Sequence, residues 1–366
     1  MPLAGKEGGG GRGILRGSRD REVRDNVMRG EGLPTLEDVA RDSGVSTATV
    51  SRCLNDPSRV ALHTRERVLA SIASLGYSPN FGARALAAKR TNTFGAVIPT
   101  MDSAIFARGL QAFQDELGRN DATLLVSSSS YDPEIEERQV RTMIARGADG
   151  LLLIGRRRGK SVERFLARQG VPVVIAWTIG KAGPHSVVGF DNAAGAAALA
   201  RRAIELGHRR FAFLSGERRA NDRAADRVLG VRRALRAHGL DPDALAVEES
   251  PYAIAEAGEA FRRLVETRPR PSIVMCGNDV QAVGALMMAR ELGLSVPGDV
   301  SVTGFDDIEL ATVVEPALTT VHVPHRDMGR RAAEVLLAHV RGVDGPRRVK
   351  LPTRLVERDS LAAPPD

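Results

Sequence analysis

The chain has 366 residues, of which 43% are hydrophobic, 27% charged and 4% aromatic. This length predicts two or three domains, and the apolar content excludes a wholly disordered chain. No apolar run approaches the ~18 residues that a membrane helix requires. The formal net charge of +7 rests on 52 basic residues, of which only five are lysine. Arginine suits phosphate recognition, but a GC-rich genome produces the same excess, so composition alone leaves nucleic-acid binding open.

The positive charge is concentrated in the first quarter of the chain, where residues 1–93 carry +5 of the net +7. Residues 1–33 contain a glycine run and several arginines but no helical apolar stripe. We expect a disordered extension there, and Met28 is a candidate for the true start. The segment lacks the apolar stretch of a secretory signal. Cys53 and Cys276 are far apart, which favours reduced thiols and a cytoplasmic protein over a disulfide framework.

Residues 35–76 show helical periodicity in short segments. The predicted caps and helices are Thr35 before 36–42, Ser46 before 47–55, and Thr64 before a helix that ends at Gly76. A tight turn over Gly44, Val45 and Ser46 joins the first two helices. Two short helices joined in this way are the geometry of a helix-turn-helix motif.

The second of these helices has a polar face opposite Val50 and Leu54. Arg52 on that face can offer a bidentate fork to a guanine edge, and its neighbours can reach phosphates or base edges. Those neighbours are Thr47, Ala48, Ser51 and Asn55. A generic helical bundle with a solvated face has the same spacing, so the pattern favours DNA binding without deciding it.

The residues from Thr35 to Asn80 resemble the headpiece of the lactose-repressor (LacI/GalR) family, without a gap. The resemblance implies that Thr47, Ala48 and Arg52 read bases. It also implies that residues 80–88 form a hinge helix that folds on operator DNA and levers Leu86 into the minor groove. Ordinary packing is the alternative for Leu86. Cys53 is expected to pack inward. The DNA-binding residues implied are Thr35, Ser46, Thr47, Ala48, Thr49, Ser51, Arg52, Asn55, Tyr77, Asn80, Ala83, Leu86 and Lys89.

From residue 94 onward, short apolar runs alternate with amphipathic helical stretches. This repeated βαβ pattern predicts an α/β fold with parallel sheets and helices on both faces. About 270 residues are long for one open sheet, so we expect two lobes. The predicted strands are 94–99, 123–127, 150–154, 171–176, 211–214, 272–276 and 300–303.

Aromatic and polar side chains follow several of these strands. Open parallel sheets bind ligands beyond the carboxyl ends of their strands, so these side chains are expected to line a cleft for a polar small molecule. The candidates are Phe106, Trp177, Arg223, Arg227, Asn278 and Asp306. A core position for Trp177 and a solvated helix start for Arg223 are open alternatives, and Asp279 is expected to cap the following helix.

The chain from 94 to about 357 resembles the periplasmic-binding-protein-like effector domain of the same family. The resemblance rests on phrases such as Gly189–Asn192, Asn278-Asp279 and Gly304–Asp307, and is closest to gluconate-type regulators. It implies a headpiece over 34–79, a hinge and linker over 80–93, and an effector-binding and dimerisation domain over 94–366. It places the crossings between lobes near 190–193, 320–324 and 343–347, with lobe 1 over about 94–191 and 323–345 and lobe 2 over about 192–322 and 346–360.

Rival functions have weaker support. The basic loop Gly155–Ser161 has three rather than four residues between its glycines, so it does not match a phosphate-binding loop, and a basic surface loop is expected. His322 and His325 flank Pro324 without further ligands, and no metal or cofactor is expected. No catalytic constellation supports an enzyme, although doubly wound sheets host many. A periplasmic sugar-binding protein would have no use for residues 35–88.

The sequence therefore predicts a transcriptional regulator, most simply a repressor. A homodimer would bind a near-palindromic operator, and a sugar or sugar acid held between the lobes would control it. The residues after Glu357 contain no leucine heptad, so a C-terminal tetramerisation bundle is not expected.

Overall fold

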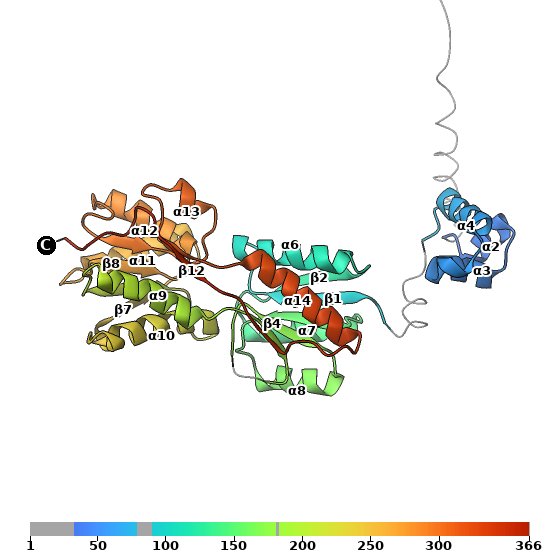
Figure 1. Cartoon of the computed structure of the whole chain (residues 1–366), viewed down its shortest axis with the longest axis horizontal. Helices are drawn as coiled ribbons and strands as arrows, with labels where there is room; N and C mark the ends of the chain where they lie inside the picture. The colour runs from blue at the N-terminus through green and yellow to red at the C-terminus, as the bar shows by residue number, and fades with distance from the viewer. Residues whose placement is uncertain (1–32, 79–89, 181–182, 366) are drawn as a thin grey trace, which may run out of the picture. The chain divides into compact units, whose positions relative to one another are not determined.

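The computed structural model describes residues 33–78, 90–180 and 183–365 (Figure 1). The chain divides into two compact units, residues 1–89 and 90–366. The expected hinge helix, with Asn80, Ala83, Leu86 and Lys89, lies outside the described residues. So does the N-terminal extension up to residue 32.

The first unit contains α2 (Leu36–Ser43), α3 (Thr47–Asn55), a 3-10 turn η1 (Pro57–Arg59) and α4 (Leu62–Leu75). These elements pack around a small apolar core that includes Cys53, which lies inward as expected. The fully buried members of that core are Val39, Ala40, Val50, Cys53 and Val68. The helical headpiece predicted from periodicity is confirmed.

Local capping signals set the ends of the first two helices. The Thr35 hydroxyl accepts from Asp38 N (3.3 Å), and the Asp38 carboxylate accepts from Thr35 N (2.9 Å), which forms a capping box. Gly44 ends α2 in the left-handed region at φ 63°. Ser46 Oγ then accepts from Thr49 N (3.2 Å) and starts α3. The predicted caps Thr35 and Ser46 are confirmed.

The prediction that Thr64 caps the third helix is wrong. α4 begins at Leu62 with Ala61 as N-cap, and no side chain caps it. Thr64 lies within the first turn, where its hydroxyl bonds to the ring of His63 (3.1 Å). A threonine just inside a helix and a threonine at its cap look alike in sequence, because both precede the apolar stripe. Gly76 does end α4, at φ 65°.

The second unit opens with a parallel sheet in the order β11-β5-β4-β3-β1-β2. Helices α6 (Ala104–Gly118) and α14 (His325–Val340) cover one face, and α7 (Pro133–Ala145) and α8 (Lys160–Gln169) cover the other (Figure 1). The strands are β1 (Thr93–Ile98), β2 (Thr123–Ser128), β3 (Gly150–Ile154), β4 (Val173–Ala176), β5 (Ser186–Gly189) and β11 (Arg348–Lys350).

A second parallel sheet, in the order β7-β6-β8-β9, forms the other lobe. Its strands are β6 (Phe211–Ser215), β7 (Ala246–Glu249), β8 (Ile273–Cys276) and β9 (Ser301–Thr303). Helix α9 (Asn192–Glu205) packs against α10 (Asp222–Ala237), and α11 (Ile254–Glu266) packs against α12 (Asp279–Glu291). Two short helices, η2 (Pro242–Ala244) and α13 (Leu310–Val313), complete the lobe. The expected two-lobed α/β fold is confirmed.

The chain passes between the lobes after β5, after β10 (Thr320–His322), and between β11 and β12 (Arg354–Val356). Strands β10 and β12 pair antiparallel. The last crossing differs from the expected 343–347, and residues 346–350 do not belong to lobe 2. The reason is that β11 pairs with β5 and completes the edge of the first sheet. A short polar edge strand carries little apolar signal in the sequence.

Residues 357–364 are built into the second lobe. Ser360 is fully buried; its hydroxyl donates to Val302 O (2.6 Å) and accepts from Thr319 N (2.9 Å). The ring of buried His208 bonds to Ala362 O (2.8 Å). This segment therefore ties β9 to the strand that precedes the second crossing.

Candidate functional site

The exposed face of α3 presents Thr47, Ala48, Arg52 and Asn55 to solvent. Asn55 Nδ2 donates to the hydroxyl of Ser51 (3.2 Å), and the hydroxyls of Ser46 and Thr49 lie 3.0 Å apart at the helix start. Arg52 makes no hydrogen bond or ion pair with any residue that the structure describes. Its guanidinium is therefore free to contact a ligand outside the protein, as base or phosphate recognition requires.

Two of the residues expected to contact DNA, Thr35 and Tyr77, also form contacts within the first unit. The Thr35 hydroxyl donates to the Asp38 carboxylate (2.7 Å), and this hydrogen bonding holds the pKa of Asp38 below its usual range. Tyr77 is half-buried against the core of the first unit. Both residues therefore shape the headpiece, whatever they contact beyond it.

In the second unit a buried polar cluster centres on Arg227 of α10. Its Nη1 donates to Asn192 Oδ1 (2.8 Å) at the start of α9, and its Nη2 donates to the hydroxyl of Tyr252 (3.1 Å). Asn221 Nδ2 donates to the same hydroxyl (3.1 Å). The guanidinium lies 5.0 Å from the ring centre of Phe305. The Nε–H of Arg227 is buried and has no partner among the described residues, so this donor remains available to a ligand.

Asp306 and Asn278 lie beside this cluster. Asp306 follows β9 with φ 108°, a left-handed conformation that is strained for a non-glycine residue and often marks a functional site. Burial raises the pKa of Asp306 well above its usual value, while Arg227 and Arg223 lower it and Asp279 raises it further. Asn278 caps α12 by accepting from Gln281 N (2.9 Å), so the expectation that Asp279 caps this helix is wrong; Asp279 is its first residue. Asp279 N donates to Phe305 O (3.0 Å), which holds the two loops together.

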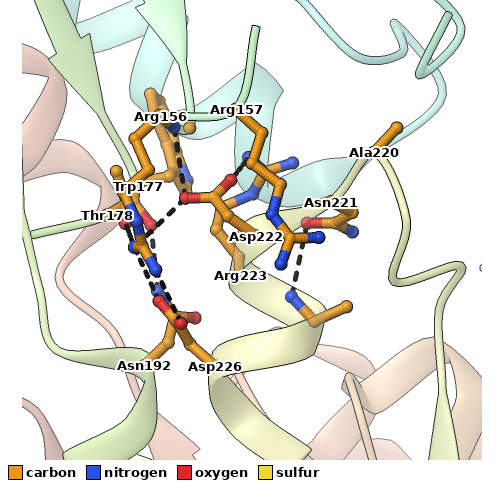
Figure 2. Close-up of polar contacts among 12 residues, drawn as sticks. Arg156, Arg157, Trp177, Thr178, Asn192, Ala220, Asn221, Asp222, Arg223 and Asp226 are labelled. Atoms are coloured by element: carbon orange, nitrogen blue, oxygen red, sulfur yellow. Dashed lines mark hydrogen bonds and ion pairs between the residues drawn. The ribbon is translucent and has the colours of Figure 1, made fainter. Parts of the chain in front are cut away.

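Trp177 lies in the apolar core of the first lobe, only 1% exposed. Its Nε1 donates to His325 Nδ1 (3.2 Å), and its ring meets Phe106 edge-on at 5.4 Å between centres. The geometry therefore favours the alternative reading of Trp177 as a core aromatic, and it places buried Phe106 there too. Only the Trp177 carbonyl joins the polar cluster, accepting from Asn192 Nδ2 (3.1 Å; Figure 2).

Arg223 is also buried rather than solvated, at 7% exposed, and it pairs with Asp222 (3.1 Å). Asp222 in turn accepts from Arg156 N (3.1 Å), in the loop that follows β3 of the first lobe. Gly155 packs so closely under Arg223 and Asp222 that a side chain there would overlap both. Arg223 is thus part of a contact between the lobes.

The basic loop after β3 contacts the second lobe, so the expectation of a plain surface loop is wrong. Arg156 forms a bidentate pair with Asp226 (both 2.7 Å), and its Nη1 also donates to Thr178 Oγ1 (2.9 Å; Figure 2). Arg157 Nη1 donates to Arg219 O (2.9 Å) and to Arg218 O. We call the Arg156 contacts with Asp222 and Asp226 the interlobe latch.

Sequence reasoning missed several members of this site. Asn192, Tyr252, Asn221 and Asp222 hold or surround Arg227 and Arg223, and Tyr131 lies near Tyr252 with ring centres 6.0 Å apart. Burial and the neighbouring Tyr252 raise the pKa of Tyr131. Tyr131 follows β2, so the rule that found the other strand-end candidates applied to it as well.

Comparison with known proteins gives the family. Residues 35–80 match the profile of bacterial regulatory proteins of the lacI family, and residues 200–361 match that of a periplasmic binding protein-like domain. The chain is 33% identical to catabolite control protein A of Priestia megaterium over 89% of this chain and 98% of the relative. The chain belongs to the LacI family. It is thus a DNA-binding transcriptional regulator, and its first unit is the DNA-binding part.

Other members of the LacI family match this chain over nearly its whole length. The regulator GntR of Pseudomonas aeruginosa is 33% identical over 87% of this chain and 92% of the relative. The crystal structure of the Lac repressor dimer bound to operator and the anti-inducer ONPF matches with a TM-score of 0.82 and 27% identity, covering 91% of this chain and all of that one. No helix in the described parts of the chain is long and apolar enough to cross a membrane.

Proposed function

We propose that this LacI-family regulator is a cytoplasmic homodimeric repressor that reads a near-palindromic operator through α3. The exposed Arg52, Thr47 and Ala48 on a firmly capped helix support this reading. Two copies of such a helix fit half-sites about one helical turn apart, roughly 34–36 Å. Leu86 in the segment 80–88 is expected to add a minor-groove contact. The protein acts by binding and not by catalysis.

The effector that suits the site best is a sugar acid, or a related sugar, held between the lobes. The observation that carries this proposal is the buried Arg227, which lies near Asp306 and whose Nε–H has no hydrogen-bond partner in the part of the chain that the structure describes. Arg227 forms no ion pair with a carboxylate in the described parts of the chain, whereas Arg223 pairs with Asp222 (3.1 Å), so the Arg227 guanidinium is the positive charge left for a ligand. An acidic group on the ligand would balance it. The similarity to regulators named GntR points the same way, and the related CelR–cellobiose complex supports a carbohydrate.

Control follows from a difference in effector affinity between the DNA-competent and DNA-incompetent arrangements of the lobes, and that coupling is reciprocal. Arg227, Asn192 and Tyr252 come from α10, the crossing after β5, and the segment before α11. A ligand that changes the hydrogen bonds among these three residues would therefore change the position of the chain segment that connects the lobes.

Selection of binding sites from random DNA tests the first half of the proposal. We expect a near-palindromic consensus, and Arg52→Ala should lose preference at one base pair in each half-site. The effector part of the proposal is then tested by fluorescence anisotropy, which measures the affinity for that DNA in the presence of gluconate, other sugar acids or neutral sugars. An asymmetric consensus would contradict the dimer. A carbohydrate that binds the protein without changing its DNA affinity would contradict its role as effector.

A further inference from the structure

A pocket beside α10 lies outside the Arg227 cluster and is not used in the proposed function. It has a volume of about 370 Å³ and is lined by Arg157, Arg218, Arg219 and Arg232, with Glu249. We call it the arginine pocket. The neighbouring α10 residues Ala225, Val228 and Leu229 supply its apolar lining.

The arginine pocket and the effector site use opposite faces of α10. Ala225, Leu229 and Arg232 are spaced by four and three residues, so they share one face of the helix. Arg223 and Arg227 are four residues apart and lie about half a turn away from that stripe. One helix therefore separates two arginine-rich sites.

The charge in the arginine pocket is only partly balanced. Arg218 pairs with Glu249, whereas Arg157, Arg219 and Arg232 form no ion pair with any carboxylate in the described parts of the chain. The nearby Glu217 carboxylate accepts from the backbone, including Ala220 N (3.1 Å). Three arginines thus face a concave site without a carboxylate partner of their own in the described parts of the chain.

Arg232 gives a second, independent sign of a ligand. Its Nε–H is buried and has no hydrogen-bond partner among the described residues. A buried donor without a partner is costly, and a ligand oxygen would satisfy it. Arginine forks are suited to phosphate and carboxylate groups, which accept two parallel hydrogen bonds.

The pocket also spans the two lobes. Arg157 comes from the loop after β3 in the first lobe, whereas the other arginines belong to the second lobe. Arg157 is held there by the carbonyls of Arg218 and Arg219. An anion in the pocket would contact both lobes at once and favour the arrangement in which the interlobe latch is formed.

We propose that the arginine pocket is an accessory site for a small metabolite with two or more negative charges, a phosphate ester or a polycarboxylate. Binding there stabilises the latched arrangement of the lobes, in addition to any effector bound at Arg227. The concave shape and the apolar lining from Leu229 fit a small molecule better than the flat backbone of DNA.

Calorimetric titration of the full-length protein with pyrophosphate and with citrate, at constant ionic strength, tests the proposal. We expect one site per chain. Binding of pyrophosphate alone assigns a phosphate ester, binding of citrate alone assigns a polycarboxylate, and binding of both assigns a site selective for charge. Heat that disappears at matched ionic strength would show nonspecific screening and overturn the proposal.

Variants locate the site. Arg232→Gln and Arg219→Gln should each weaken binding about tenfold or more, because each removes a charged donor. Arg233→Gln is the matched control: Arg233 is exposed, adjacent on α10 and outside the pocket lining. Equal affinity for Arg232→Gln, Arg219→Gln and Arg233→Gln would overturn the site.

Two further variants separate this inference from the proposed effector site and test the bridge between lobes. Arg227→Ala should leave pyrophosphate or citrate binding within about twofold, and its loss there would place the anion in the effector site instead. Arg157→Ala should weaken binding as Arg232→Gln does. If Arg157→Ala has no effect, the pocket does not join the lobes.

Discussion

At the scale of single residues, the small net charge of the headpiece bears on the role proposed for Arg52. Residues 34–93 carry eight basic and five acidic side chains, a net of +3. Such a field supports only modest nonspecific attraction to DNA. Selection of the operator sequence is therefore expected to depend on individual side chains at fixed positions, and Arg52 on the exposed face of α3 is the clearest candidate.

Arg52→Ala is expected to cost about 1–3 kcal/mol of operator binding and to relax specificity at one base pair. Arg41→Ala is a suitable control, because Arg41 is an exposed arginine of the same unit that already pairs with Asp38. Fluorescence anisotropy with operator variants at fixed salt measures both. Uniform weakening on every sequence would reassign Arg52 to a phosphate contact.

Arg227→Ala is expected to abolish the effector response while operator affinity in the absence of effector stays within about twofold, since Arg227 belongs to the second compact unit and the operator is read by the first. The same substitution leaves Asn192 and Tyr252 without their charged partner, so a loss of stability is expected as well. Thermal unfolding read by far-UV circular dichroism must therefore show that the variant is folded at the assay temperature. Loss of operator binding by a folded variant would assign Arg227 a structural role.

Asp279 gives a pH prediction. It is fully buried and accepts from Thr320 Oγ1 (2.6 Å) and Ile308 N (2.8 Å), and burial raises its pKa to about 7. An unfolded aspartate titrates near pH 3.9. The raised pKa therefore contributes stability that is full below about pH 4 and is lost as the pH rises to about 7.

The wild-type free energy of unfolding should fall relative to Asp279→Asn by up to ~1.4 kcal/mol per pH unit within that window. Urea unfolding at pH 5, 6, 7 and 8, followed by circular dichroism, gives the difference directly. Parallel curves for the two proteins across this range would mean that the buried carboxyl ionises normally.

At the scale of elements, the C-terminal segment acts as part of the second lobe. Ser360→Ala removes a hydroxyl that joins Val302 O to Thr319 N, and it should lower the free energy of unfolding by about 1–3 kcal/mol. Ser295→Ala is the matched control, because Ser295 is exposed in the same lobe. Equal stabilities of the two variants would mean that water replaces the buried hydroxyl.

Elements were predictable where the signal is local. Helix starts were predictable from the capping side chains of Thr35 and Ser46, and a helix end from the left-handed backbone of Gly76. The central strands were predictable from their apolar runs. β11 could not be found in this way, since Arg348–Lys350 is a short edge strand without an apolar run. Likewise the Arg156–Asp226 pair joins residues 70 positions apart, and no local pattern links them.

At the scale of the whole molecule, the βαβ pattern and the chain length predicted the two-lobed fold and the resemblance predicted the family, whereas neither predicted the side-chain conformations of the site. Trp177 ends a strand at the carboxyl edge of its sheet, as a ligand contact would. A left-handed backbone at φ 61° instead turns it into the core against Phe106 and His325. Strand-end position alone does not distinguish these directions.

The late crossing of the chain has a consequence for synthesis. The first sheet is completed by β11, and the second lobe by residues 354–362, which bond to Thr320, Val302 and His208. Both lobes therefore depend on residues that leave the ribosome after more than 340 others have been made. The DNA-reading helix α3 is synthesised long before the domain that regulates it is complete. In each newly made molecule the capacity to respond to an effector therefore depends on the last residues to be made.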